Sequence, residues 1–231
     1  MTTLSLLSGG AAHSLVAALA PAFRAETGAG IDGVYGAVGA MRERLIGGHP
    51  ADLLILTRPL IDELSQEGHL LADSVADIGM VRTAIAARAG GPLPDVSTPE
   101  ALRASLLGCD EIHFPDPSLA TAGIHFAGVL AQLGIASEVA DALRPHPNGK
   151  TAMAALAASA AARPIGCTQV TEIIADPGVA LVAPLPPGLG LETAYTAAVC
   201  ARSGHGELAR LLVSLLADPR QAETRRRCGF E

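Results

Sequence analysis

The sequence has few aromatic and few charged residues. Its 231 residues include no tryptophan, and aromatic residues make up only 3%. Charged residues make up 17%, and 16 basic against 23 acidic residues give a net charge of −7. An acidic chain with so few rings lacks the basic surface and the stacking platforms of a nucleic-acid-binding protein. With 49% hydrophobic residues the chain is too apolar to be disordered, and it can bury one large core or two small ones.

Clustered cysteine and histidine residues are lacking as well. The four cysteines are widely spaced and contain no C-x-x-C pair: Cys109, Cys167, Cys200 and Cys228. This spacing predicts free, buried thiols and not a disulfide framework. A zinc site needs cysteines and histidines close together, so we expect no metal site and no cofactor.

The N-terminal segment 1–23 is apolar and contains no Lys, Arg, Asp or Glu. It therefore lacks the positively charged start of a signal peptide. Small and polar residues and Pro21 interrupt it, which argues against a membrane span. We expect a strand, a glycine loop and a helix here. A cytoplasmic location follows, or a periplasmic one if an export signal has been removed.

Short apolar runs alternate with helix-length segments along the whole chain. The alternation predicts an α/β protein with parallel sheets covered on both faces. Two loops rich in proline and glycine, at 90–94 and 184–188, bracket the middle of the chain. They predict two lobes, residues 1–80 plus 190–231 and residues 81–189. The expected strands are 4–7, 30–35, 52–56, 81–87, 112–114, 165–167, 180–183 and 194–200, and the expected helices are 11–26, 41–46, 59–67, 99–107, 120–133, 150–162 and 207–216.

Four glycine-containing or polar turns follow predicted strands. They are Ser8-Gly9-Gly10-Ala11, Tyr35-Gly36-Ala37-Val38-Gly39-Ala40, Asp116-Pro117-Ser118 with Thr121-Ala122-Gly123, and Ile165-Gly166-Cys167-Thr168-Gln169. Glycine lets the backbone approach a ligand, and the first N–H groups of a helix attract anions. Ligands of open α/β sheets bind outside the carboxyl ends of the strands. Each turn alone fits an ordinary strand-to-helix connection, but four in one chain favour a site for an anionic ligand.

These turns, in this order, resemble the molybdate-binding proteins of ABC transporters. The resemblance covers essentially the whole chain and includes Phe23–Gly28, Pro50-Ala51-Asp52 and the terminal Cys228-Gly229-Phe230. It implies the type-2 periplasmic-binding-protein fold. In that fold, two α/β lobes joined by a two-strand hinge close on a small anion in the cleft between them.

Several positions depart from the family pattern. The family holds molybdate with serine hydroxyls and backbone N–H groups of the first two loops, but Ala11 and Ala37-Val38 stand there in this chain. Gln169 replaces a family tyrosine. These replacements remove hydroxyl groups that suit a compact tetrahedral oxyanion.

Two cations are added where the family usually has none. Arg58 follows Thr57 after the third predicted strand, and Lys150 stands at an apolar family position near a helix start. Cations at such positions suit carboxylates, which arginine can bind in bidentate fashion. Either residue alone could equally be an ordinary surface charge. Together they lead us to hypothesise a small di- or tricarboxylate ligand.

Two histidines are candidates for proton transfer, the reaction to which imidazole is suited near neutral pH. His13 lies in the first turn after the first glycine loop, and His125 lies on the helix after Asp116-Pro117. Either could instead be an ordinary surface or core residue. His49, His69, His146 and His205 lie in loops or at the ends of elements, and we expect them to be exposed. The candidate ligand-binding residues are Ser8, Gly9, Gly10, Ala11, Ala37, Val38, Thr57, Arg58, Ser118, Thr121, Ala122, Lys150, Thr168 and Gln169.

Two functions fit these residues. The molybdate-binding-like group includes a branch similar to aconitate isomerase, which moves a double bond within a tricarboxylate. On that resemblance we expect a clamp for a small polycarboxylate that isomerises it by a 1,3-proton shift. The alternative is a non-catalytic solute-binding protein for molybdate, tungstate or another small anion, acting as a transporter receptor or a cytoplasmic sensor. Either function implies a small anionic ligand, and either a monomer or a homodimer.

Overall fold

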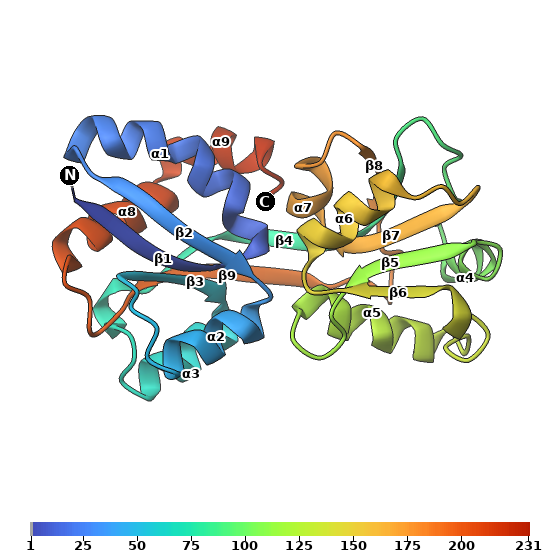
Figure 1. Cartoon of the computed structure of the whole chain (residues 1–231), viewed down its shortest axis with the longest axis horizontal. Coiled ribbons are helices and arrows are strands. Elements are labelled where there is room, and N and C mark those ends of the chain that lie inside the picture. Colours follow the sequence, from blue (N-terminus) through green and yellow to red (C-terminus); the bar gives the residue numbers. More distant parts are fainter. Residues whose placement is uncertain (1) are drawn as a thin grey trace. The chain divides into compact units, whose positions relative to one another are not determined.

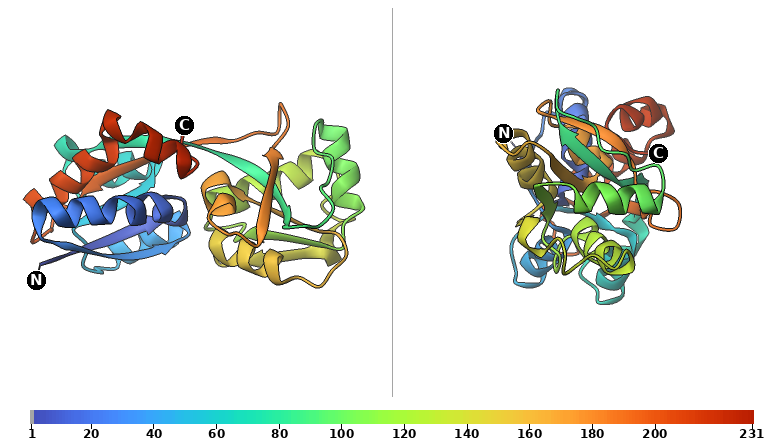
Figure 2. Two further views of the ribbon diagram at one scale, coloured as in Figure 1. Left: turned by 90° about the horizontal axis from the view of Figure 1, so that it is seen from above. Right: turned by 90° about the vertical axis from the view of Figure 1, so that its right-hand side faces the viewer.

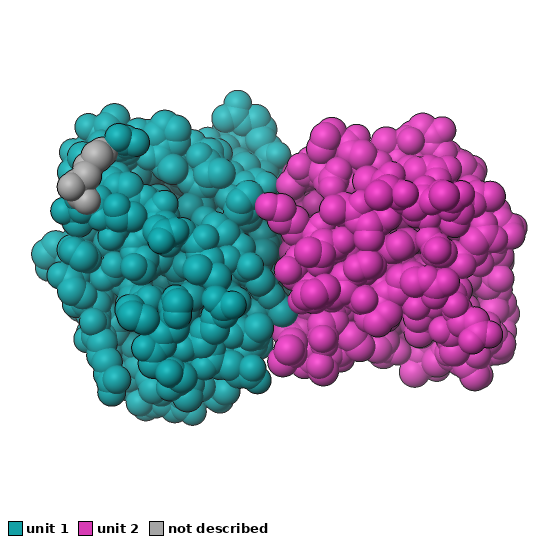
Figure 3. Space-filling view, in the orientation of Figure 1, with its two compact units in different colours: residues 1–81, 193–231 teal, residues 82–192 magenta. Residues whose placement is uncertain are grey.

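The chain folds into two compact α/β units (Figures 1 and 3). The structure, a computed structural model, describes residues 2–231. Unit 1 comprises residues 1–81 and 193–231, and unit 2 comprises residues 82–192. The chain leaves unit 1 within β4 (Ala76–Arg88) and returns to it at the start of β9 (Glu192–Val199). Each unit therefore contains its own sheet, helices and core.

The sheet of unit 1 has the strand order β2 (Gly30–Gly36), β1 (Thr3–Gly9), β3 (Leu53–Thr57) and β9. β1 runs parallel to β2 and to β3. A helix follows each of these strands directly or after one short turn: α1 (His13–Thr27), α2 (Val38–Ile46) and α3 (Arg58–Gln66). α8 (Gly206–Ala217) and α9 (Ala222–Arg227) lie beside α1 (Figure 2).

The sheet of unit 2 has the order β8 (Val179–Pro184), β4, β7 (Pro164–Gln169), β5 (Glu111–Pro115) and β6 (Leu143–His146). β5 runs parallel to β6 and β7. α5 (Thr121–Gln132) follows β5, α6 (Gly149–Ala158) follows β6, and α7 (Val170–Ile174) follows β7. α4 (Pro99–Leu107) precedes β5.

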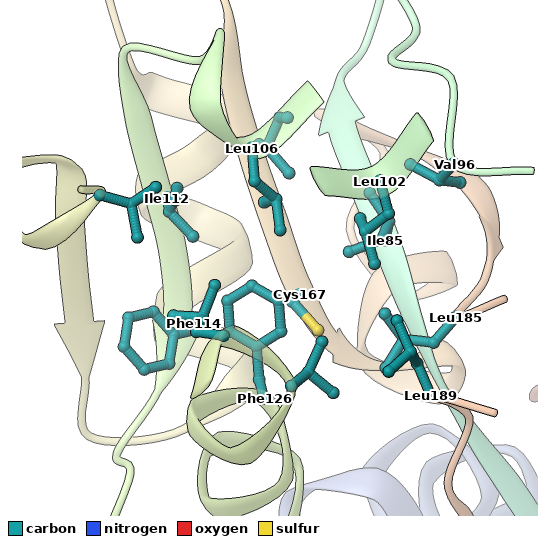
Figure 4. Packing of buried hydrophobic residues seen from close by; sticks show 14 of the residues in the cluster. Ile85, Val96, Leu102, Leu106, Ile112, Phe114, Phe126, Cys167, Leu185 and Leu189 are labelled. Carbon is teal, nitrogen blue, oxygen red and sulfur yellow. The ribbon is translucent and has the colours of Figure 1, made fainter. Parts of the chain in front are cut away.

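Both faces of the unit 2 sheet are buried. Ile85, Ile112, Phe114, Phe126 and Cys167 belong to the core on the α4 and α5 face (Figure 4). On the other face a second core is formed against α6 and α7 by Ala84, Ala86, Ala152, Met153, Leu156 and Ile173. Successive residues of a strand point to opposite faces, so burial on both sides explains the unbroken apolar run of β4.

The expected parallel pairing holds for β1–β3 and for β5–β7, but each unit also contains antiparallel pairs. β9 runs antiparallel to β3, and β4 runs antiparallel to both β7 and β8. The register gives the reason. The chain re-enters unit 1 at the edge where β3 ends, with Tyr195 opposite Thr57, and it enters unit 2 where β7 ends, with Thr83 opposite Gln169. Alternation of helices and strands carries no information about these directions.

Two further expectations need correction. The helix predicted over 150–162 ends at Ala158, since Ser159 has extended backbone angles and Arg163 precedes Pro164, a position that disfavours helix. The four cysteines are free throughout the described chain, but only Cys167 and Cys200 are buried, whereas Cys109 and Cys228 are partly exposed. None of the helices formed by residues 2–231 has the length and apolar character to cross a membrane.

At the start of α5, Gly123 lies in close contact with the backbone at the end of β5. A Cβ on Gly123 would overlap with the carbonyl oxygens of Pro115 and Asp116. We expect Gly123→Ala to lower the free energy of unfolding by about 1–3 kcal/mol, because backbone atoms cannot move aside. Gly128→Ala, on the same helix, is the control, since its Cβ would meet no described atom within 4 Å. It should be neutral or stabilise by up to about 1 kcal/mol. Urea unfolding of both variants measures the contrast, and equal stabilities would contradict it.

Candidate functional site

The carboxyl ends of β1, β2 and β3 carry the candidate loops of unit 1. A Cβ on Gly9 would lie 2.9 Å from Val38 Cγ1 and 3.1 Å from Tyr195 Cε1, so glycine lets the first loop pack against the second. The N-cap residues of α1 and α2 are Ala12 and Ala37, whose side chains contain no hydrogen-bond acceptor. The first N–H groups of these helices therefore receive no side-chain cap, and such groups favour an anion.

His13 begins α1 and lies against Tyr35 at the end of β2. The two rings meet edge to face, with centroids 4.6 Å apart and planes at 89°. Burial, together with nearby Asp32, raises the pKa of Tyr35 to about 12. The phenol therefore keeps its proton near neutral pH. An imidazole and a neutral phenol stand together beside the first two loops.

Arg58 is exposed at the start of α3 and is paired with two carboxylates of its own unit. Its Nε lies 2.8 Å and 3.0 Å from the oxygens of Asp62, and its Nη1 lies 3.2 Å from both oxygens of Asp77. Asp77 also accepts a 2.6 Å hydrogen bond from Thr196. The hydrogen bonds to Asp62 and Asp77 raise the pKa of Arg58. A ligand carboxylate would have to share this guanidinium with them.

The two hydroxyl residues proposed in unit 1 are buried. Ser8 is 0% exposed, and its Oγ donates to the carbonyl oxygen of Gly9 at 2.9 Å. Thr57 is the N-cap residue of α3 and is also buried. The loops of unit 1 thus offer mainly backbone groups at their surface.

In unit 2, Asp116 shapes the loop between β5 and α5. Its Oδ1 accepts hydrogen bonds from the Ser118 hydroxyl at 2.6 Å, the Ser118 N–H at 2.7 Å and the Leu119 N–H at 3.1 Å. The bonds from Ser118 hold the pKa of Asp116 below its usual range. The exposed Ser118 hydroxyl is therefore engaged in the turn. Thr121 and Ala122 begin α5 after the N-cap residue Ala120.

His125, on the first turns of α5, has a fixed hydrogen-bond partner. Its Nε2 lies 2.8 Å from the carbonyl oxygen of Leu189. A carbonyl only accepts, so Nε2 carries the proton and Nδ1 of the neutral ring carries the lone pair. The ring is half-buried.

Sequence reasoning missed Glu172, which lies among the candidate residues after β6 and β7. Its carboxylate accepts a 2.6 Å hydrogen bond from the Thr168 hydroxyl and hydrogen bonds from the N–H groups of Gln169 and Lys150. A Cβ on Gly149 would overlap with this carboxylate and with the Thr168 hydroxyl, so a larger residue would have to displace these side chains. Burial raises the pKa of Glu172, against the hydrogen bonds, which lower it. The only sequence signal was its spacing of four residues from Thr168.

The carboxylate of Glu172 therefore occupies donors that had been assigned to a ligand. The Thr168 hydroxyl and the Lys150 N–H are engaged, while the Lys150 side chain is exposed and the Gln169 side chain is buried. The side chain of Asn148, the N-cap residue of α6, also accepts a hydrogen bond from the Thr151 N–H at 2.9 Å.

The expected exposure of the four other histidines was correct for His49 and His205 only. His69 is half-buried. His146 is half-buried too, because its Nε2 lies 3.1 Å from Nδ1 of the buried His113. Within residues 2–231, His, Cys, Asp and Glu form no group of three that could hold a metal ion.

A separate hollow of about 360 Å³ lies at the amino ends of β5 and β7. Its lining includes Leu93, Cys109 and Arg163. It is far along the strands from the loops described above. Because ligands of open α/β sheets bind at the carboxyl ends, we do not assign the ligand to it.

Comparison with known structures shows the fold of a solute-binding protein. The periplasmic molybdate-binding protein of Azotobacter vinelandii superposes with a TM-score of 0.83 at 17% identity, covering 99% of this chain and 98% of that one. The sulfate-binding protein SubI of Mycobacterium tuberculosis superposes with a TM-score of 0.78 at 21% identity, covering 100% and 86%. At these identities the likeness concerns the fold, and it confirms the predicted periplasmic-binding-protein architecture.

The chain belongs to the bacterial extracellular solute-binding protein family, whose model matches residues 4–231. It is also 28% identical to an aconitate isomerase from a Pseudomonas species over 223 residues, which are 94% of this chain and 83% of the relative. The resemblance to molybdate-binding proteins and to aconitate isomerase, drawn from the ordered loops, is therefore confirmed.

The raised pKa of Glu172 predicts a particular pH dependence of stability. Folding favours the protonated form of this carboxyl, so its contribution is largest below the ordinary value of 4.5 and falls as pH rises through the raised value. Wild type should therefore lose stability relative to Glu172→Gln as pH rises from below 4.5 through the raised value. Urea unfolding across this range measures the difference. Glu138→Gln, at an exposed position, is the control. A pH-independent difference between wild type and Glu172→Gln would contradict the prediction.

Proposed function

We propose that this protein binds a small di- or tricarboxylate and isomerises it by a 1,3-proton shift. The observation that carries the proposal is the replacement of the hydroxyl-bearing loops by Ala11 and Ala37-Val38, while cations stand at Arg58 and Lys150. The identity with an aconitate isomerase over most of the chain supports the same class of ligand. Uncharged hydroxyl groups suit a tetrahedral oxyanion, whereas added cations suit carboxylates.

Each unit has loops that we propose for ligand binding. In unit 1 the backbone N–H groups at Gly9, Gly10, Ala11, Ala37 and Val38 would face a carboxylate, with Arg58 shared between the ligand and its own aspartates. In unit 2 the start of α5 at Thr121 and Ala122 and the exposed ammonium of Lys150 would bind a carboxylate. Ser8, Thr57, Ser118, Thr168 and Gln169 act mainly by holding these loops, because their side chains are buried or engaged.

The proposed reaction needs a group that removes a proton next to a carboxylate and a group that returns one at the far carbon. His13 and His125 are the candidates. His13 lies beside the neutral phenol of Tyr35, and His125 retains a lone pair on Nδ1 because Nε2 donates to Leu189. Backbone N–H groups and cations stabilise the negative charge that develops on the substrate.

The second candidate function is non-catalytic binding of an oxyanion. The fold similarity to a molybdate-binding and a sulfate-binding protein favours it. Such a protein would use the uncapped N–H groups of α1 and α2 and would need no base.

We expect di- and tricarboxylates, including aconitate, to raise the melting temperature, and molybdate, tungstate, sulfate and phosphate to leave it unchanged. Lys150→Ala should weaken carboxylate binding roughly 10- to 100-fold, because a hydrogen bond to a charged group contributes about 1.5–3 kcal/mol. Arg202→Ala, an exposed cation of unit 1, is the control. Stabilisation by molybdate or tungstate alone would replace the carboxylate proposal with the oxyanion alternative.

A measurement of catalytic turnover distinguishes the isomerase function from non-catalytic binding. We expect either aconitate isomer, incubated with the protein, to be converted into the other, as followed by NMR. If His13 or His125 transfers the proton, its replacement by Gln should lower kcat roughly 10²- to 10⁴-fold with little change in binding. Normal turnover by both single variants would reject these two histidines as the proton-transfer groups.

A further inference from the structure

Glu111, His113 and His146 form a hydrogen-bonded chain on one face of the unit 2 sheet. Glu111 and His113 are two residues apart in β5 and therefore point to the same face of the sheet, and His146 is the last residue of β6. The parallel register pairs Pro115 with His146, which places His146 on the same face as Glu111 and His113. α6 packs against β5 and β6, and His113 is only 5% exposed.

The distances in this chain are those of hydrogen bonds. Nε2 of His113 lies 3.1 Å from Oε2 of Glu111, and Nδ1 of His113 lies 3.1 Å from Nε2 of His146. The two ring planes differ by 18°. The Ser159 hydroxyl, just past the end of α6, donates to the same Glu111 oxygen at 2.6 Å. Nε of Arg144 lies 3.8 Å from the other oxygen.

The positions of the protons follow from these partners. The hydrogen bonds from Ser159 and His113 hold the pKa of Glu111 below its usual range, so Glu111 is a carboxylate and only accepts. His113 must then donate from Nε2, and its Nδ1 accepts. His146 therefore donates from Nε2, which leaves the lone pair of His146 on Nδ1. Burial, and then the charge of His113, lowers the pKa of His146, so this base is neutral near pH 7.

The chain can carry a proton inward. When Nδ1 of His146 takes a proton, the proton on its Nε2 can pass to Nδ1 of His113. The positive charge then rests on His113, next to the Glu111 carboxylate, which stabilises it. The charged groups beside the pair are Glu111 from β5 and Arg144 from β6, and α6 contributes the hydroxyl of Ser159.

His146 stands at the edge where ligand loops leave the sheet of unit 2. β5 and β6 end at the same edge (Figure 1), because they are parallel neighbours. The loop with Asp116 and Ser118 leaves from β5, and the loop that leads to Lys150 leaves directly after His146. Ligands of open α/β sheets bind at this edge.

We propose that His146 is a proton-transfer group for the polycarboxylate ligand, and that His113 and Glu111 are positioning residues that hold its tautomer and take up its charge. This inference rests on the proposed isomerisation. In the step, a substrate C–H bond breaks and its proton goes to Nδ1 of His146. The C–H electron pair forms the new double bond, and the electrons of the old double bond take up a proton at the far carbon from Nδ1 of the protonated His146. His146 is thereby restored to its neutral form, and because one proton leaves the substrate and one returns, no oxidant or reductant is needed.

The first test uses the free protein and needs no ligand. Histidine side chains labelled with ¹⁵N should show the proton of both neutral rings on Nε2. The two rings should not take up protons independently, because two imidazolium rings cannot share this hydrogen bond. A proton on Nδ1 of neutral His146, or two independent titrations, would overturn the relay.

The second test is the kinetics of three variants. His146→Gln should lower kcat at least about 100-fold with KM nearly unchanged. Glu111→Gln should lower kcat and also move the ascending limb of its pH profile to lower pH, because the imidazolium loses its carboxylate partner. A merely structural role would leave that limb in place. His49→Gln, at an exposed position, is the control.

These outcomes distinguish failure of the proposed role of His146 from failure of the proposed isomerase function. If His146→Gln isomerises the substrate at the wild-type rate, His146 has no role in proton transfer, but the proposed function is not contradicted. Absence of any turnover in wild type, with carboxylate binding present, rejects the isomerase function and the catalytic role of His146 together. Loss of turnover in His146→Gln with an unchanged melting temperature, and a shifted profile in Glu111→Gln, supports the relay.

Discussion

The candidate site depends on one steric constraint, which is that helices must begin in contact with the ends of the strands. Glycine meets this constraint three times: Gly9 packs against Val38 and Tyr195, Gly123 against the backbone of Pro115 and Asp116, and Gly149 against Glu172. At Gly123 a side chain would overlap with backbone atoms, and at Gly9 and Gly149 it would have to displace neighbouring side chains. The close approach places the positive ends of the helix dipoles beside the carboxyl ends of the strands, where they favour an anion. Where α1, α2 and α5 begin, the alanine N-cap residues provide no side-chain hydrogen-bond acceptor.

Carboxylates of the protein already pair with some of the cations and N–H groups near these helix starts. Asp62 and Asp77 share the guanidinium of Arg58, and Glu172 takes the donors at the start of α6. The cations and N–H groups of the site are therefore not equivalent. Those at α1, α2 and α5 have no side-chain cap, whereas Arg58 and the start of α6 are held in internal pairs. In unit 2 the site thus rests on α5, the exposed Lys150 and, in our proposal, His146, a set that suits an extended polycarboxylate better than a compact oxyanion.

Local patterns in the sequence predicted the elements and the order of the loops, because apolar runs and glycine turns are read within a few residues. The helix at Pro99–Leu107 and the loop at Gly9 show this. Strand direction could not be predicted, since the directions of β4 and β9 depend on where the chain enters each unit. The sequence did not single out Glu172, and it predicted an exposed His146, because the contacts of both residues are long-range. Their partners Gly149 and His113 lie 23 and 33 residues away, and only the register of β5, β6 and β7 brings them together.

In our proposal, this member of a solute-binding family binds a polycarboxylate and not a tetrahedral oxyanion. Isothermal titration calorimetry of the purified protein with aconitate, and separately with molybdate, distinguishes the two ligands. We expect saturable binding of aconitate and no heat of binding with molybdate at the same concentrations. Saturable molybdate binding without aconitate binding would contradict it, and would mean that the uncapped N–H groups of α1 and α2 are sufficient to hold an oxyanion.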